Sequence, residues 1–286
     1  MKVFCVKAYA KINLFLHITS KKETGYHSIE SLFAFANLAN FLEIRVECKK
    51  YRYDNSEVKF VNSESKLHSR YNTVMKAINS LLRYGPTYTK ISVKVVKNIP
   101  TASGLGSGSS DAGAVIRTLG RFWDIDQSIL NEIALDIGAD VPASIESKPV
   151  FVSGVGEELC PVQGVSLPTD IVLVKPKKKF LSTPEVYSKY TGEFSQSIDW
   201  HNEQNLLELV QNARNDLQEA AISLVPEIQE VISALELQKG CVLARMSGSG
   251  VACFGMFDNK ENAKAAVVNI KAKYPEWWVC NTQLII

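Results

Sequence analysis

The stretch that decides the interpretation of this chain is Pro100-Thr101-Ala102-Ser103-Gly104-Leu105-Gly106-Ser107-Gly108-Ser109-Ser110-Asp111. It follows residues 90–97, in which polar and apolar residues alternate as in a β-strand. It precedes residues 112–122, whose apolar residues fall on one face of a helix. Glycine reaches positive φ and approaches ligands closely, and the first turn of a helix offers N–H groups without intrahelical acceptors. Such a loop favours an anion such as phosphate, with serine hydroxyls as further donors. A surface loop that only caps the helix is the plainer alternative.

Two common phosphate-binding patterns do not fit this loop. A Walker A loop ends in Gly-Lys-Ser/Thr, but no lysine follows Gly108. A dinucleotide fingerprint needs a third glycine, at the position that Ser109 occupies. The loop is therefore a candidate anion site built without lysine.

Outward from the loop, hydrophobic periodicity predicts a mixture of strands and helices without internal repeats. The expected strands are residues 3–6, 12–18, 41–48, 90–97, 150–155, 171–174, 251–257 and 278–286. The expected helices are residues 72–84, which Asn72 or Thr73 can cap, 112–122, 128–137, 206–237 with a break at Pro226, and 260–273. The length of 286 residues fits either two modest domains or one large α/β domain. If there are two, the boundary falls near residues 155–170, which gives domains of residues 1–158 and 159–286. The last strand of the second domain can return to the first.

Composition limits the classes of function. The 32 basic and 30 acidic residues give a net charge of +2, which argues against non-specific nucleic-acid binding. The six cysteines form no CxxC pair, which argues against a zinc site, and their apolar neighbours predict buried thiols in a reducing compartment. The sequence has neither a signal peptide nor about 20 consecutive apolar residues, so we expect a cytoplasmic protein.

Three further short motifs carry groups suited to chemistry. Lys11-Ile12-Asn13 places a cation and an amide on a predicted strand, and residues 138–142 place Asp140 at the exit of a helix. Residues 245–250, Arg-Met-Ser-Gly-Ser-Gly, form a second small glycine- and serine-rich segment. Each motif alone also has an ordinary interpretation: a surface lysine, a turn-forming aspartate and a tight turn.

In this order, the motifs resemble those of the galactose, homoserine, mevalonate and phosphomevalonate (GHMP) kinase superfamily. The closer resemblance is to a branch whose acceptor is a methylerythritol linked to cytidine diphosphate. The segments that carry the resemblance are residues 10–14, 25–27, 104–106, 138–142, 154–157, 215–217 and 244–248. The resemblance extends over nearly the whole chain.

The resemblance implies a fold and a reaction. The implied fold is α+β: a two-domain GHMP-kinase fold, with an N-terminal, ribosomal-protein-S5-like ATP-binding domain, a C-terminal ferredoxin-like α+β domain, and the active site in the cleft between them. The reaction transfers phosphate from ATP to the 2-hydroxyl of the cytidine-linked methylerythritol, a step of isoprenoid synthesis without mevalonate. Mg²⁺ is expected mainly on the ATP phosphates, with a small-molecule substrate and a monomer or weak homodimer.

The resemblance also implies roles for individual residues. Asp140 acts as general base or stabilises developing charge, and Lys11 pairs with it. Asn13 contacts the methylerythritol hydroxyls or the phosphates, His27 bonds the cytosine edge, and Tyr26 or Tyr187 stacks on the ring. The expected ATP-binding residues are Pro100, Ala102, Ser103, Gly104, Leu105, Gly106, Ser107, Gly108, Ser109 and Ser110.

The chain departs from the family pattern in the loop, where Ala102, Ser103 and Ser107 stand in place of the more usual glycine. These side chains are small, so the phosphate site is expected to persist with less freedom for positive φ. A homoserine-type or mevalonate-type kinase is the alternative within the superfamily. A catalytically silent nucleotide-binding regulator is a third interpretation, which the presence of both Lys11 and Asp140 disfavours.

Overall fold

The computed structural model describes residues 1–23, 25–48, 56–62, 72–162, 164, 166–200 and 205–286. They form two compact units, each assembled from separate parts of the chain. The first unit comprises Met1–Ala10, Leu38–Thr101 and Gly106–Ser147, and the second comprises Lys11–Asn37, Ala102–Leu105 and Lys148–Ile286. Two long strands, β1 (Lys2–Lys21) and β2 (His27–Cys48), contribute residues to both units.

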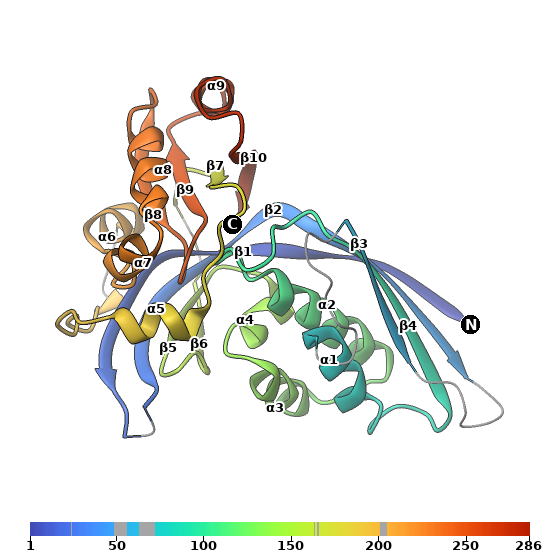
Figure 1. Cartoon of the computed structure of the whole chain (residues 1–286). Helices are drawn as coiled ribbons and strands as arrows, with labels where there is room; N and C mark the ends of the chain where they lie inside the picture. Colours follow the sequence, from blue (N-terminus) through green and yellow to red (C-terminus); the bar gives the residue numbers. More distant parts are fainter. Residues whose placement is uncertain (24, 49–55, 63–71, 163, 165, 201–204) are drawn as a thin grey trace. The chain divides into compact units, whose positions relative to one another are not determined.

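In the first unit, helices pack on one side of a small sheet (Figure 1). The later part of β2 pairs antiparallel with β4 (Thr89–Val96), and β3 (Glu57–Val61) runs parallel to β4. Alternate residues of these strands, such as Leu42 and Ile44, are buried in the core shared with the helices. The helices are α1 (Thr73–Leu81), α2 (Ser107–Phe122), α3 (Gln127–Ile137) and α4 (Val141–Glu146).

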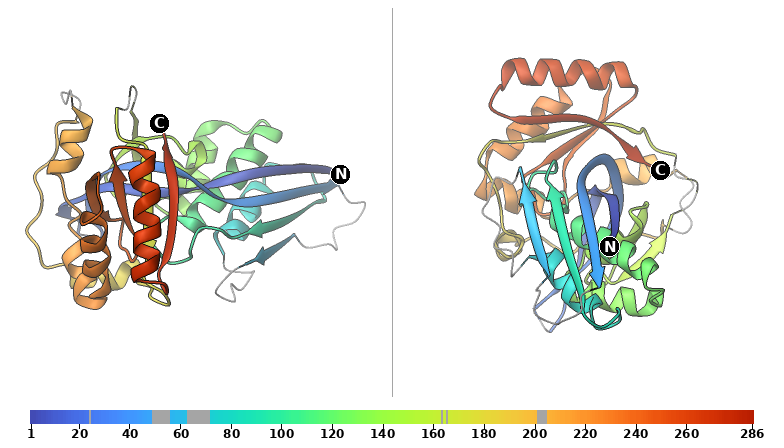
Figure 2. Two further views of the ribbon diagram at one scale, coloured as in Figure 1. Left: turned by 90° about the horizontal axis from the view of Figure 1, so that it is seen from above. Right: turned by 90° about the vertical axis from the view of Figure 1, so that its right-hand side faces the viewer.

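The second unit contains an antiparallel sheet in the order β10-β7-β9-β8. Helices α8 and α9 lie against this sheet (Figure 2), and their apolar faces share its core. The end of β10 also pairs with β2 at Ala36 and Phe35, and β5 forms a hairpin with β6 beside β2. The strands are β5 (Val150–Ser153), β6 (Glu158–Pro161), β7 (Asp170–Lys175), β8 (Cys241–Met246), β9 (Cys253–Phe257) and β10 (Trp278–Ile285). The helices are α5 (Thr183–Lys189), α6 (Leu206–Asn212), α7 (Gln218–Leu224), α8 (Glu227–Glu236) and α9 (Lys260–Lys273).

The α+β class expected from the sequence is confirmed, and so are several local details. Asn72 caps α1, because its side chain accepts a hydrogen bond from the backbone N–H of Met75 at 2.8 Å. The break at Pro226 separates α7 from α8, as expected from a residue that cannot continue a helix. Among the helices of the described residues, none is long and apolar enough to cross a membrane.

Several expectations about the secondary structure are wrong. The helix expected from residue 112 begins at Ser107, and the strand expected at residues 41–48 is the end of β2, which begins at His27. The predicted strands at residues 3–6 and 12–18 are parts of the single strand β1, whose residues 10–18 are all buried. Residues 7–11, Lys-Ala-Tyr-Ala-Lys, lie between the two predicted segments, and because lysine and alanine are depleted in strands, the continuity of β1 was hidden. The helical region 206–237 is divided into α6, α7 and α8 rather than broken once.

The expectation that the cysteines are buried is also wrong for most of them. Only Cys253 is buried, Cys241 and Cys280 are intermediate, and Cys5, Cys48 and Cys160 are exposed. Cys5 lies on the solvent-facing side of the early part of β1, where burial alternates with a period of two. Apolar neighbours in sequence therefore did not indicate burial, because successive residues of a strand point to opposite faces.

Candidate active site

The middle of the 100–111 loop, residues 102–105, belongs to the second unit and is held there by backbone contacts. The N–H of Lys11 donates to the carbonyl of Leu105 at 3.1 Å, and the N–H of Ala252 donates to that of Ser103 at 2.9 Å. Gly104 has φ +80°, and a Cβ at this position would lie 2.1 Å from the carbonyl oxygen of Ser247. Only glycine therefore fits between β1 and the 247–252 turn.

The end of the loop, from Gly106 onward, belongs to the first unit and leads into α2. Gly106 adopts the left-handed conformation with φ 62°, and Ser107 is the first helical residue. The N–H of Ser110 bonds the carbonyl of Gly106 at 2.8 Å, so the earlier N–H groups of the helix are those without intrahelical acceptors. The Ser110 hydroxyl oxygen is buried and has no hydrogen-bond partner among the described residues. The start of α2 thus presents backbone donors and one unsatisfied hydroxyl.

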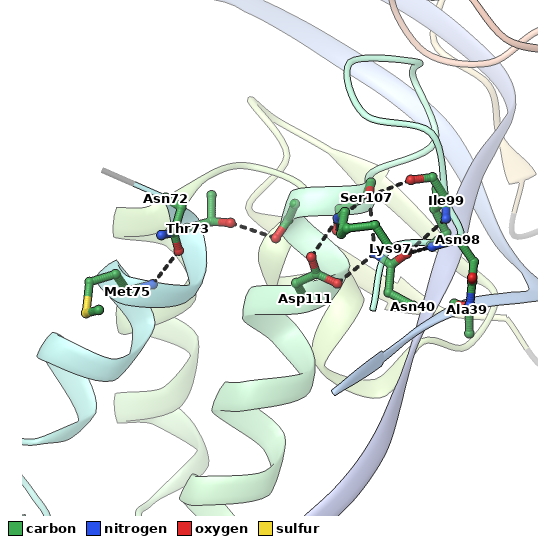
Figure 3. Close-up of polar contacts among 11 residues, drawn as sticks. Ala39, Asn40, Asn72, Thr73, Met75, Lys97, Asn98, Ile99, Ser107 and Asp111 are labelled. Carbon is green, nitrogen blue, oxygen red and sulfur yellow. Dashed lines mark hydrogen bonds and ion pairs between the residues drawn. The ribbon is translucent and has the colours of Figure 1, made fainter. Parts of the chain in front are cut away.

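Beneath the start of α2 lies a buried polar network that links the loop to β4 and β2 (Figure 3). The ammonium of Lys97 lies 2.7 Å from Asp111 Oδ2, and the two side chains are 3% and 1% exposed. Asn40 donates to Asp111 Oδ1 at 2.8 Å and accepts from the N–H groups of Asn98 and Ile99. Burial raises the pKa of Asp111, while the charge and hydrogen bond of Lys97 act in the opposite direction. The network thus connects residues 98–99, where the segment before α2 begins, with Ser107 and Asp111 in the first turns of α2.

The same network occupies the hydroxyl of Ser107, one of the residues predicted to bind ATP. Its oxygen accepts hydrogen bonds from Lys97 and Asn40, and its proton is donated to the carbonyl of Ile99 at 3.2 Å. A hydroxyl has one proton, so this one has no donor left for a phosphate. Ser107 can still offer its backbone N–H.

In the second unit, the structure brings together Lys11, Asn13 and the 247–250 turn. Lys11 is 3% exposed; its ammonium donates to Asn13 Oδ1 at 2.6 Å and lies 4.4 Å from the ring centre of Phe33. The N–H of Asn13 donates to Ser247 Oγ at 3.2 Å, and Ser247 Oγ donates to the carbonyl of Gly104 at 3.1 Å. The first and third predicted motifs therefore meet the glycine loop within one unit.

Asp140, in the first unit, immediately precedes α4 and is half-buried. Its side chain does not cap that helix, while its carbonyl accepts from Ser144 Oγ at 2.7 Å. Helix α4 packs closely on α2, because a Cβ at Gly113 would lie 2.7 Å from the backbone of Ser144. The position of Asp140 thus depends on a close approach between two helices.

The predicted cytosine-binding residues only partly come together. His27 and Tyr187 stack with ring centres 5.2 Å apart, and Tyr190 meets His27 edge-on at 6.1 Å. Desolvation lowers the pKa of His27, with a smaller contribution from Lys21, so its imidazole is neutral at pH 7. Tyr26 is not in this stack, and its side chain is 70% exposed.

Sequence reasoning did not predict how two residues of its motifs, Asn215 and Arg245, support these groups. Asn215 Nδ2 donates to the carbonyls of Met246 and Gly248 at 2.9 and 2.8 Å and braces the turn that contacts Gly104. The guanidinium of Arg245 donates to the carbonyls of Leu14, Val210 and Ala213, and its burial lowers its pKa to about 10. The 215–217 segment was part of the resemblance, but nothing in its spacing indicated which backbone groups it binds.

Comparison with known proteins defines the class. The model of the GHMP kinases N terminal domain matches residues 72–148, and that of the GHMP kinases C terminal domain matches residues 199–276. These two matches cover more than half of the chain and include the loop and Asp140. The chain belongs to the GHMP kinase family.

Comparison with individual relatives shows which members of the GHMP kinase family the chain is similar to. The chain is 69% identical, over all of both chains, to a 4-diphosphocytidyl-2-C-methyl-D-erythritol kinase of Wolbachia sp. subsp. Drosophila simulans (strain wRi). It is 41% identical, over all of both chains, to the enzyme of that name from Ehrlichia canis (strain Jake). A crystal structure of 4-(cytidine 5'-diphospho)-2C-methyl-D-erythritol kinase matches with a TM-score of 0.78 and 28% identity, covering 98% of this chain and 99% of that one. Within its family, the chain groups with the 4-diphosphocytidyl-2-C-methyl-D-erythritol kinases.

Proposed function

We propose that this chain transfers the γ-phosphoryl group of ATP to the 2-hydroxyl of 4-diphosphocytidyl-2-C-methyl-D-erythritol, a step of isoprenoid synthesis without mevalonate. The observation that carries the proposal is the 69% identity, over the full length of both chains, to a relative named for this kinase activity. Lys11, Asp140 and the glycine loop, which the chemistry requires, are all present in the chain.

The ATP phosphates are assigned to the loop and the start of α2. The free N–H groups at the start of α2 and the positive end of its dipole favour an anion. The unsatisfied hydroxyl of Ser110 supplies a further donor, whereas Ser107 contributes through its backbone. Gly104 and Gly106, both with positive φ, allow the backbone to approach the nucleotide closely.

Mg²⁺ is assigned to the nucleotide rather than to a protein cage. The described residues contain no group of three or more histidine, cysteine, aspartate or glutamate side chains that could hold a metal ion. Mg²⁺ retains water readily and binds substrate phosphates with few protein ligands, so this chain suits delivery of the ion with ATP. When bound, the ion neutralises charge on the phosphate oxygens.

The transfer itself needs positioning and charge neutralisation more than covalent chemistry. The acceptor oxygen forms a bond to the γ-phosphorus, the bond from that phosphorus to the β-phosphate oxygen breaks, and ADP leaves. Asp140 receives the proton of the acceptor hydroxyl. Lys11, a buried cation held by Asn13, stabilises negative charge that develops during the transfer.

The acceptor is assigned to His27 and the tyrosines. The neutral imidazole of His27 has one donor and one acceptor nitrogen, which suits the polar edge of cytosine. The stack of His27 on Tyr187 holds that ring in a defined orientation. Tyr26, with an exposed ring, is available to cover the base when it binds.

Coupled measurement of ADP release, with and without the cytidine-linked acceptor, tests the proposal. The wild-type chain is expected to release ADP only with this acceptor, and Lys11→Ala and Asp140→Asn are each expected to lose turnover while remaining folded. Phosphorus NMR of the product identifies the phosphorylated hydroxyl. Turnover of mevalonate or homoserine without turnover of the cytidine compound would contradict the assignment, and full activity in either variant would contradict the mechanism.

A further inference from the structure

Ser31 is a fully buried serine on β2 whose hydroxyl contacts two residues of β1, in the second unit. It is 0% exposed, and its hydroxyl donates to the carbonyl of Phe15 on β1. Its oxygen also lies 2.9 Å from Nδ2 of Asn13. Because a carbonyl can only accept, the single proton of Ser31 is committed to Phe15, and towards Asn13 the hydroxyl can only accept.

This polarity determines the orientation of the Asn13 amide. The NH₂ group must face Ser31, so the amide oxygen faces the ammonium of Lys11, 2.6 Å away. The opposite orientation would place two donors against each other at Lys11 and two acceptors against each other at Ser31. Asn13 is 1% exposed, so water could not readily compensate for either mismatch.

Lys11 depends on such fixed partners because it is itself buried. The oxygen of Asn13 and the face of the Phe33 ring contact its ammonium, and only 3% of the residue is exposed. A desolvated ammonium is stabilised by acceptors whose orientation is already set. The order of the contacts is thus Phe15 carbonyl, Ser31 hydroxyl, Asn13 amide and Lys11 ammonium.

We propose that Ser31 is a positioning residue for phosphoryl transfer: by orienting the amide of Asn13, it holds the ammonium of Lys11 where the reaction needs it. The inference rests on the proposed function, because it assumes that Lys11 serves the transfer. It also assigns Asn13 to the orientation of Lys11, in place of the direct substrate contact that the resemblance implied.

The test is a kinetic double-mutant cycle with Ser31→Ala, Asn13→Ala and the double variant. Ser31→Ala leaves the NH₂ group of Asn13 without its acceptor, and misplacement of a reacting group by about 1 Å can cost roughly 100-fold in rate. We expect kcat to fall roughly 10- to 100-fold while KM for ATP and for the acceptor changes less than about 3-fold. The double variant is expected to be no slower than Asn13→Ala, because both changes interrupt the same chain of contacts.

Two further variants separate positioning from a general structural effect. Ser31→Thr keeps the hydroxyl and is expected to recover most of kcat. Ser223→Ala removes another serine whose hydroxyl bonds a carbonyl, that of Ala220 in α7, and is expected to match the wild type. Urea denaturation establishes that each variant is folded under the conditions of the assay.

The outcomes are distinct for the two proposals. Loss of turnover in Lys11→Ala together with an unchanged kcat in Ser31→Ala would overturn this inference alone. Additive losses in the double variant would also overturn it, because independent effects exclude a shared chain of contacts. A wild-type chain that does not phosphorylate the cytidine-linked acceptor would overturn the proposed function and, with it, this inference.

Discussion

Removing the positive charge of Lys97 is expected to destabilise the first unit strongly. The Lys97 ammonium and the Asp111 carboxylate lie 2.7 Å apart, with side chains only 3% and 1% exposed. A buried ion pair adds little net stability, but loss of one partner leaves an uncompensated charge and costs about 3–5 kcal/mol. We therefore expect Lys97→Met to lower the free energy of unfolding by about 3–5 kcal/mol, a large part of the typical total of about 5–15 kcal/mol.

A second variant makes this reasoning refutable. Lys97→Met with Asp111→Asn removes both charges and keeps an amide beside Asn40, so we expect it to recover about 2 kcal/mol of the loss. Urea denaturation followed by circular dichroism measures both variants. A loss below about 1 kcal/mol for Lys97→Met, or strictly additive effects, would refute the argument.

The pH dependence of Lys97→Met provides an independent check. Burial raises the pKa of Asp111, and Lys97 opposes that rise in the wild type. Without Lys97 the pKa of Asp111 rises further, so the folded state takes up a proton that the unfolded state does not hold. The variant should therefore gain stability on acidification and lose it as pH rises through the raised pKa. The double variant should lack this gain.

The remaining predictions concern backbone strain, a buried histidine and the thiols. Gly104→Ala should abolish turnover and cost at least about 1–3 kcal/mol, because φ is +80° and the new Cβ would meet the Ser247 carbonyl at 2.1 Å. Its matched control for stability, Ala102→Gly, should stay within about 1 kcal/mol of the wild type, since Ala102 already has φ 49°. Burial lowers the pKa of His17, so on acidification the unfolded state takes up a proton before the folded state does. At pH values below about 6.5, the free energy of unfolding should therefore decrease by at most about 1.4 kcal/mol per pH unit. His17→Gln should reduce this pH dependence in urea denaturation, and an unchanged slope would contradict the prediction. A thiol reagent followed by mass spectrometry should label the exposed cysteines in the folded chain and Cys253 only after unfolding; early labelling of Cys253, whose burial raises its pKa, would be inconsistent with the structure. The exposed cysteines are Cys5, Cys48 and Cys160.

Local sequence was sufficient for features that depend on near neighbours. The Asn72 cap, the break at Pro226 and the left-handed glycine before α2 involve contacts within a few residues or the φ preference of one residue. The family motifs also identified Lys11 and Asp140 as the candidate catalytic pair, and their roles remain predictions.

Partners distant in sequence could not be predicted. Lys97 and Asp111 are 14 residues apart, and Asn40 is 71 residues from Asp111, so no helical or strand period relates them. Asn13 and Ser247 are 234 residues apart. The long strand β1 was also divided in prediction, because residues 7–11 are rich in lysine and alanine, which are depleted in strands.

The sequence by itself determined the class of protein, the glycine loop with its following helix, and the identities of the candidate catalytic residues. These depend on residue type and short spacing, which are properties of the chain before it folds. Only the tertiary structure decided that the Ser107 hydroxyl is used within the protein and that Ser31, through Asn13, orients Lys11. The physical reason is that a hydroxyl or amide has few donors and acceptors, and the partners that occupy them come from strands and turns brought together by burial of the core.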